Sequence, residues 1–176
     1  VVAYNLNAGE VLQFVTRMPA VGTACPGTST TRVDLSDGTC TLTRTYCSMD
    51  ANYDLTGTRI DTSAPVAVFG GHNCTFVPYT KWACDHLEEQ MFPLETWGKE
   101  FVVARTEPQH MATFPIEPNV VRVLSGADGN ALTFNPAVRA PVTLNRGQYV
   151  EFETTSDFVV RGTGPTLISH FLVGQD

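Results

Sequence analysis

The sequence predicts an all-β fold, an antiparallel β-sandwich built from a duplicated β-unit, and three observations lead to this prediction. Short runs of alternating or β-branched residues recur between Gly, Pro, Asn and Asp turn residues. Helical periodicity is nearly absent. Residues 6–16 resemble residues 144–154, and residues 54–71 resemble residues 157–174. Two such units pack most simply face to face, because each alternating strand has one apolar face to bury.

The first unit begins with a turn at residues 7–10, which leads into a predicted strand at residues 11–15. Residues 17–52 then interrupt the repeat, because they are rich in Thr, Ser and Gly and contain few large apolar residues. We expect a Cys-rich insertion here, with a small hairpin around residues 37–38.

Five cysteines in the chain indicate an exported domain with disulfide bonds. Within the insertion, Cys25–Cys40 and Cys40–Cys47 are both possible pairings, and the spacing does not choose between them. The odd number leaves one thiol free or bonded to a cysteine outside the chain.

The rest of the chain contains further short runs with strand character. These runs cover residues 54–60, 66–69, 99–105, 120–124, 131–134, 149–153 and 167–173. An Asp-Gly pair at residues 128–129 lies between two of them and supplies the positive φ that a tight turn needs. We therefore predict a hairpin formed by residues 120–124 and 131–134.

Length and charge restrict the class of protein. A chain of 176 residues is expected to form one domain, residues 1–176, and its abrupt start in strand-like sequence suggests a fragment of a larger protein. The net charge of -7 argues against binding to nucleic acid or to an anionic membrane surface. No apolar run approaches the ~20 residues that span a bilayer, so no membrane insertion is expected.

The middle of the chain concentrates reactive residue types around Cys74 and Cys84, with His72 and His86 placed symmetrically outside them. A disulfide, a zinc site and a Cys/His nucleophile pair are all chemically possible. The nine residues between the cysteines do not match the usual zinc-finger spacing, and nothing marks a low-pKa thiol. We favour the disulfide and expect neither a metal nor another cofactor.

A short helix is predicted directly after Cys84. Asp85 is a good N-cap, Glu88 follows three residues later as in a capping box, and Pro93 would end the helix. The alternative is that Asp85, Glu88 and Glu89 form a cation site or an acid/base site.

The loop between the two cysteines carries three aromatic residues, Phe76, Tyr79 and Trp82. An aromatic loop tethered to a β scaffold is a candidate ligand-binding surface, with His72 and His86 at its rim. The alternative is that Phe76 and Trp82 only cover the end of the sandwich.

Several of these residues also form an ordered signature over about residues 53–104. It consists of Leu-Thr-Gly-Thr, Pro-Val-Ala-Val-Phe-Gly-Gly-His, Cys, Cys-Asp-His, Glu-Gln, Pro and Trp-Gly-Lys-Glu-Phe-Val-Val. This pattern resembles the N-terminal domain of the IgGFc-binding protein family. The resemblance implies an extracellular or cell-surface location and a bacterial surface protein. It also implies an architectural role for the signature residues Cys74, Cys84, Asp85, His86, Glu89, Gln90 and Trp97.

The expected function is a non-catalytic recognition or adhesion module that binds an extracellular glycoprotein or glycan, next to neighbouring domains of the parent protein. A structural stalk or spacer domain is the alternative. A metal-dependent hydrolase that uses His72, His86 and nearby acids is a second alternative. The chain lacks Gly-x-Ser-x-Gly, a phosphate loop, His-Glu-x-x-His and a dinucleotide fingerprint.

Overall fold

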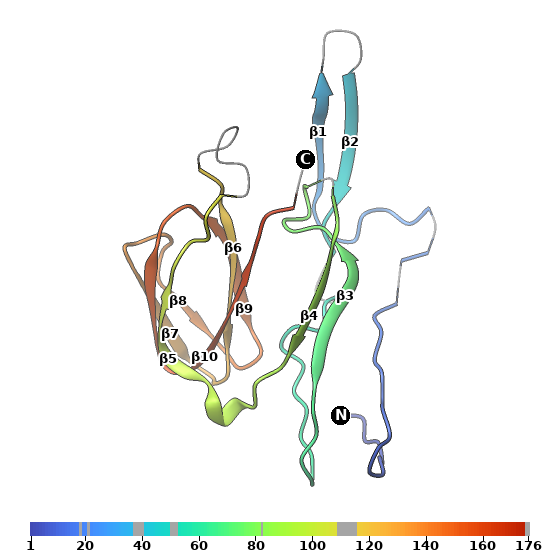
Figure 1. Cartoon of the computed structure of the whole chain (residues 1–176), viewed down its shortest axis with the longest axis vertical. Coiled ribbons are helices and arrows are strands. Elements are labelled where there is room, and N and C mark those ends of the chain that lie inside the picture. Colours follow the sequence, from blue (N-terminus) through green and yellow to red (C-terminus); the bar gives the residue numbers. More distant parts are fainter. Residues whose placement is uncertain are drawn as a thin grey trace.

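The computed structural model describes residues 1–17, 19–20, 22–36, 41–49, 53–81, 83–108 and 116–174, except for the side chains of residues 32–36. The predicted all-β class is confirmed, because the elements of these residues are antiparallel strands and the short 3-10 helix η2 (Leu94–Thr96). Figure 1 shows a curled sheet on one side and two hairpins on the other. The strands are β1 (Ser29–Ser36), β2 (Thr41–Cys47), β3 (Phe69–Thr75), β4 (Asp85–Gln90), β5 (Gly98–Val103), β6 (Asn119–Ser125), β7 (Asn130–Asn135), β8 (Val142–Leu144), β9 (Tyr149–Thr154) and β10 (Phe158–Phe171).

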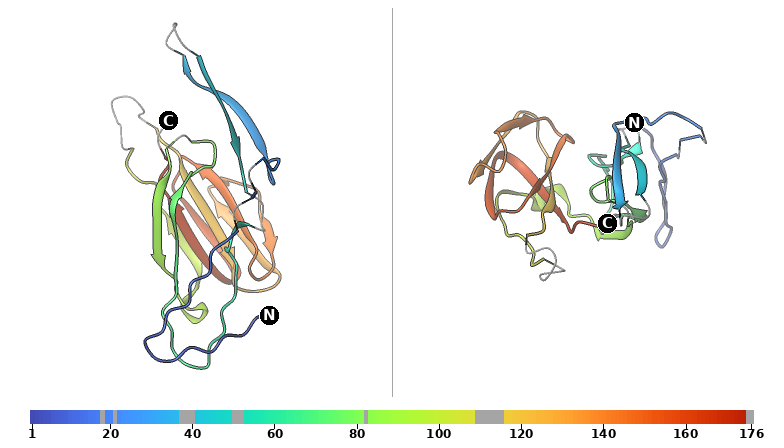
Figure 2. Two further views of the ribbon diagram at one scale, coloured as in Figure 1. Left: turned by 90° about the vertical axis from the view of Figure 1, so that its right-hand side faces the viewer. Right: turned by 90° about the horizontal axis from the view of Figure 1, so that it is seen from above.

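The largest sheet has the strand order β8-β7-β10-β6-β9, with β5 also paired to β10. The long strand β10 changes neighbours along its length. Its first part pairs with β5 and β7, whereas residues 166–171 pair with β6. Gly164 and Pro165 lie between the two parts, directly after Gly162, and the strand can bend most easily here. The sheet therefore curls and encloses its own apolar face (Figure 2).

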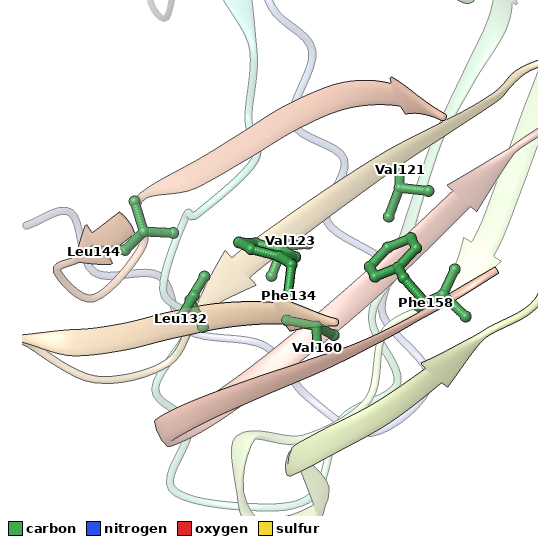
Figure 3. Close-up of a cluster of buried hydrophobic side chains, with 8 residues drawn as sticks. Val121, Val123, Leu132, Phe134, Leu144, Phe158 and Val160 are labelled. Atoms are coloured by element: carbon green, nitrogen blue, oxygen red, sulfur yellow. The ribbon is translucent and has the colours of Figure 1, made fainter. Parts of the chain in front are cut away.

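The core lies inside this curl. Alternation in β7 buries Leu132 and Phe134 while it exposes Ala131, Thr133 and Asn135, as expected for a strand with one buried face. The side chains of the cluster point toward one another in Figure 3. Its members are Val103, Val121, Val123, Leu132, Phe134, Leu144, Phe158 and Val160. Burial of each large side chain contributes about 1.5–3 kcal/mol.

The predicted hairpin of residues 120–124 and 131–134 is wrong. Gly129 does adopt a positive φ of 65°, but β6 and β7 do not pair, because each pairs with β10 instead. The connection carries the chain from one part of the curled sheet to another, and the Gly126 amide donates to the Pro165 carbonyl at 2.8 Å. The local turn signal is therefore correct and the pairing inferred from it is not.

The predicted helix after Cys84 is also wrong, because residues 85–90 form the strand β4. This strand pairs with β3, from Phe69 opposite Gln90 to Thr75 opposite Asp85. Only eight residues separate Cys84 from Pro93, and a helix of two turns gains little without packing. Pairing with β3 satisfies the backbone groups on one edge of the segment and joins it to a distant part of the chain, so it outweighs the capping signal.

The N-terminal unit differs from the prediction. The turn at residues 7–10 is present, with the Glu10 amide 3.1 Å from the Asn7 carbonyl, but residues 11–15 form no strand. Residues 54–60 contain a turn at Gly57 rather than a strand, and β3 begins only at Phe69. The duplication and the face-to-face sandwich therefore stay predictions.

The insertion contains the expected hairpin, since β1 and β2 pair antiparallel on either side of residues 37–40. Its disulfide joins Cys25 to Cys47, with 5.5 Å between the Cα atoms. Both pairings considered from the sequence used Cys40 and are wrong, because the hairpin register brings Ser29 opposite Cys47 and so places the strand ends together. Cys40 lies outside the described residues.

Two turns join the region before β3 to the large sheet. Gly57 and Gly147 both have positive φ, and their backbones lie so close that a Cβ on Gly57 would be 2.0 Å from the Gly147 carbonyl oxygen. Beside this contact, Arg122 donates to Asp54 at 3.3 Å and forms an ion pair with Glu151 at 2.8 Å. The region before β3 is thus attached to β6 and β9 by backbone contact and by charge.

Candidate functional site

The loop between Cys74 and Cys84 is restrained at its ends and in its middle. The predicted disulfide is present, with 5.1 Å between the Cα atoms. Inside the loop, the Lys81 amide donates to the Pro78 carbonyl at 3.0 Å and forms a tight turn. The buried Gly174 near the C-terminus donates its amide to the Val77 carbonyl at 2.7 Å. These restraints hold the loop in one conformation on the β3–β4 hairpin.

The cysteine-rich hairpin contacts this loop. The hydroxyls of Thr30 on β1 and Tyr79 in the loop form a hydrogen bond of 2.9 Å. At the base of the hairpin, Ser48 accepts a hydrogen bond from the Thr28 amide through its hydroxyl, at 2.7 Å. Two segments that are far apart in sequence, each closed by its own disulfide, therefore meet at Tyr79.

A depression of about 350 Å³ lies at this junction. Phe76 is 43% exposed at its edge, whereas Tyr46 is buried at 8%. The lining residues are Arg44, Thr45, Tyr46, Cys47, Phe76 and Tyr79. Aromatic rings beside an arginine and a threonine can pack on an apolar ligand surface and bind its polar groups.

The structure brings only some of the predicted site residues to this place. Phe76 and Tyr79 line the depression, and Trp82 lies outside the described residues. His72 is exposed on β3, where its Nδ1 atom accepts from the Cys74 amide at 3.0 Å. His86 is exposed on β4, with Nε2 3.4 Å from a Glu88 carboxylate oxygen. Neither histidine lines the depression.

Sequence reasoning missed the residues that β2 contributes. Arg44, Thr45 and Tyr46 precede Cys47 in a segment that carries no recognisable motif. Their place follows from the Cys25–Cys47 disulfide and from the contact between Thr30 and Tyr79, neither of which the sequence alone reveals.

The family-signature residues mostly have local roles. Asp85, Glu89 and Gln90 are exposed on β4. Trp97 donates from Nε1 to the Phe92 carbonyl at 3.1 Å, which closes the segment after β4. Its ring also packs over Gly126, where a Cβ would lie 3.0 Å from the Trp97 ring. Trp97 thus links the hairpin side of the molecule to the large sheet.

The disulfide removes the cysteine ligands that the zinc and Cys/His nucleophile interpretations require. The Cys74–Cys84 disulfide leaves no thiolate at these positions for zinc or for a Cys/His pair. Among the residues that the structure describes, no group of three or more His, Cys, Asp or Glu side chains could hold a metal ion. In the same part of the chain, no helix has the length and apolar character that crossing a bilayer requires.

Fold and site together define an all-β, disulfide-bonded protein with a shallow aromatic depression. The family described as IgGFc binding protein matches the chain over residues 1–176, and the chain belongs to this family. It is 29% identical over 106 residues to the human IgGFc-binding protein. The match covers 60% of this chain and 2% of the human protein.

The human relative gives no support to the bacterial source that the resemblance implied. No solved structure is significantly similar to the chain.

Proposed function

We propose that this chain is a non-catalytic, extracellular or cell-surface recognition module that binds a glycoprotein or glycan through the depression beside Tyr79. Membership of a family named for binding the Fc region supports a glycoprotein ligand. The single observation that carries the proposal is the junction of two disulfide-closed segments, which places Phe76, Tyr79 and Arg44 around one hollow.

The chemistry of the hollow suits a sugar or an aromatic side chain. The half-exposed Phe76 ring can stack on either, and such anchors contribute much of the binding energy in protein interfaces. Thr45 and Arg44 place polar groups next to the rings, as needed to orient a ligand. The disulfides keep the surface preorganised, which lowers the entropy lost on binding.

Binding to immunoglobulin G, mucins and a glycan array tests this proposal, with the purified chain immobilised. Phe76→Ala is expected to weaken binding by roughly tenfold or more, because an aromatic anchor is removed. Phe92→Ala is the matched control, since Phe92 is 61% exposed and lies outside the depression. Equal affinities for the two variants, or no binding to any of the three ligand sets, would contradict the proposal.

A structural spacer is the second candidate function. The Tyr79 hydroxyl is engaged by Thr30, so this ring contributes to holding the two hairpins together. If Tyr79→Phe lowers stability while the glycoprotein and glycan panel shows no binding, the spacer function is favoured.

A further inference from the structure

The N-terminal segment presents an unusual amount of apolar surface. Residues 1–17 contain no strand, and large apolar side chains along them are exposed. Leu12 is 37% exposed, Phe14 52% and Val15 77%. An extended segment with such side chains exposes both an apolar face and a row of unpaired backbone groups. We call residues 11–16 the arm.

The arm has a counterpart in the same chain. Asn7–Glu10 and Asn145–Gln148 form the same turn, closed by backbone hydrogen bonds of 3.1 Å and 3.0 Å. In each turn, the side chain of the fourth residue accepts a hydrogen bond of 2.8 Å from the backbone amide of the first residue. The third residue of each turn is a glycine with positive φ. The residues after the second turn form β9, which matches the arm in sequence order. In β9, Phe152 occupies the place of Phe14.

The two phenylalanines have different environments, because β9 has a strand partner and the arm has none among the described residues. The ring of Phe14 instead lies 5.4 Å from the ring of Tyr4 in the same N-terminal segment. Phe152 packs against the core and is opposite Val121 of β6, whereas Phe14 is half exposed. Strand β6 is paired on both sides, with β9 on one and the end of β10 on the other. In the predicted repeat, residues 157–174 correspond to residues 54–71, so the end of β10 corresponds to the segment that leads into β3 and includes its first residues.

The edge of β3 that faces away from β4 has no strand partner among the described residues. Among the described residues, β3 pairs only with β4. β9 and the end of β10 run parallel to each other, because both are antiparallel to β6. The arm and β3 also run in the same direction in Figure 1. The arm and β3 are therefore oriented as β9 and β10 are, with no strand equivalent to β6 between them in the described residues.

We propose that the arm and the open edge of β3 form an acceptor for one extended polypeptide strand with the chemistry of β6. The incoming strand runs antiparallel to both and forms ladder hydrogen bonds with both. Its apolar side chains alternate, as Val121 and Val123 do in β6, and they cover Leu12 and Phe14. This is recognition by strand addition, in which the backbone supplies affinity and the alternate side chains supply specificity.

A synthetic peptide with the sequence of residues 118–126, labelled with fluorescein, tests the proposal by fluorescence anisotropy against the intact chain. We expect saturable binding, and we expect backbone amides of residues 11–16 and 69–72 to become protected from hydrogen exchange. The same peptide with proline in place of Val123 should not bind, because proline cannot donate to the ladder and disrupts strand geometry.

Two matched variants distinguish strand addition at this acceptor from nonspecific binding of the peptide to exposed apolar side chains. Phe14→Glu is expected to weaken peptide binding by roughly tenfold or more, since the counterpart Phe152 faces the core. Val15→Glu should leave it unchanged, because its counterpart Glu153 is already an exposed glutamate in β9. Both wild-type positions are exposed, and the ring contact of Phe14 is with Tyr4 of the same N-terminal segment, so neither change should affect the folding of the large sheet.

Absence of peptide binding would overturn the proposal. Equal effects of the two glutamate variants would do so as well. Protection confined to β9 or β8 would show that the peptide joins the edges of the large sheet instead, and this outcome also contradicts the acceptor. None of these outcomes depends on the depression beside Tyr79.

Discussion

Arg122 forms ion pairs with two carboxylates, Asp54 and Glu151. Its guanidinium donates to Glu151 at 2.9 Å and to Asp54 at 3.3 Å, and it also donates to the Thr56 hydroxyl. It lies 4.5 Å from the centre of the Tyr149 ring. With its side chain 22% exposed, water screens these contacts less than it screens the open pair of Arg161 and Glu100. Arg122 therefore fastens the residues before β3 to β6 and β9.

Asp54 provides a pH prediction at this site. Burial raises the pKa of Asp54, but hydrogen bonds from Thr56, the Arg122 charge and the Tyr149 hydroxyl together lower it below its ordinary value. The folded state thus favours the carboxylate. Its stabilising contribution is complete above the unfolded pKa, near 3.9, and is lost as pH falls through the lower folded pKa.

Urea denaturation at pH 6 and at stepwise lower pH checks this expectation. Asp54→Asn should lower the free energy of unfolding at pH 6 by roughly 1–2 kcal/mol and should flatten the acid dependence below about pH 4. Asp61→Asn is the control, because Asp61 has 71% of its side chain exposed and pairs with the nearby, exposed Arg59. An acid dependence unchanged by Asp54→Asn would contradict the assignment.

At the scale of elements, the β3–β4 hairpin depends on its disulfide. Replacing Cys74 and Cys84 together by serine should cost about 2–3 kcal/mol, because a loop of about ten residues regains its freedom in the unfolded chain. Thermal unfolding of the double variant measures this. We also expect weaker binding at the depression, since Phe76 and Tyr79 lose their restraint. A variant with wild-type stability would show that the loop is held by Gly174 and Thr30 alone.

Sequence patterns predicted the strands of the large sheet better than those of the hairpins. β5, β7 and β9 lie close to their predicted ranges, because clean alternation there coincides with a buried face. For β4 the capping signal around Asp85 and Glu88 indicated a helix, and pairing with β3 decided the outcome. Tertiary pairing overrides local propensity most easily in segments of this length.

The candidate site was predictable only in part. Phe76 and Tyr79 stood out as aromatics between two cysteines, and the Cys74–Cys84 bond followed from composition and spacing. Arg44 and Tyr46 carried no signal, since their role comes from the contact of two hairpins that are separated by more than twenty residues. Such contacts depend on three-dimensional packing and not on any local pattern.

At the scale of the molecule, stability resides in the curled sheet. Phe158 is 2% exposed and its ring centre lies 6.1 Å from that of Phe134 and 5.7 Å from that of Phe152. Phe158→Ala should lower the free energy of unfolding by about 3–5 kcal/mol, because a large cavity forms in the core. Chemical denaturation measures this loss.

The exposed phenylalanine at position 92 gives the comparison, since Phe92→Ala should change stability by less than about 0.5 kcal/mol. Similar losses for the two variants would show that the core does not lie where the curled sheet encloses it.

The sequence by itself determined the all-β class, the aromatic loop between Cys74 and Cys84 and the family resemblance. These features depend on local periodicity, residue type and order along the chain. Only the tertiary structure decided that β10 separates β6 from β7, that residues 85–90 pair with β3, and that Cys25 bonds Cys47. The physical reason is that a strand satisfies its backbone and buries its apolar face only against a partner, and distant parts of the chain supply that partner.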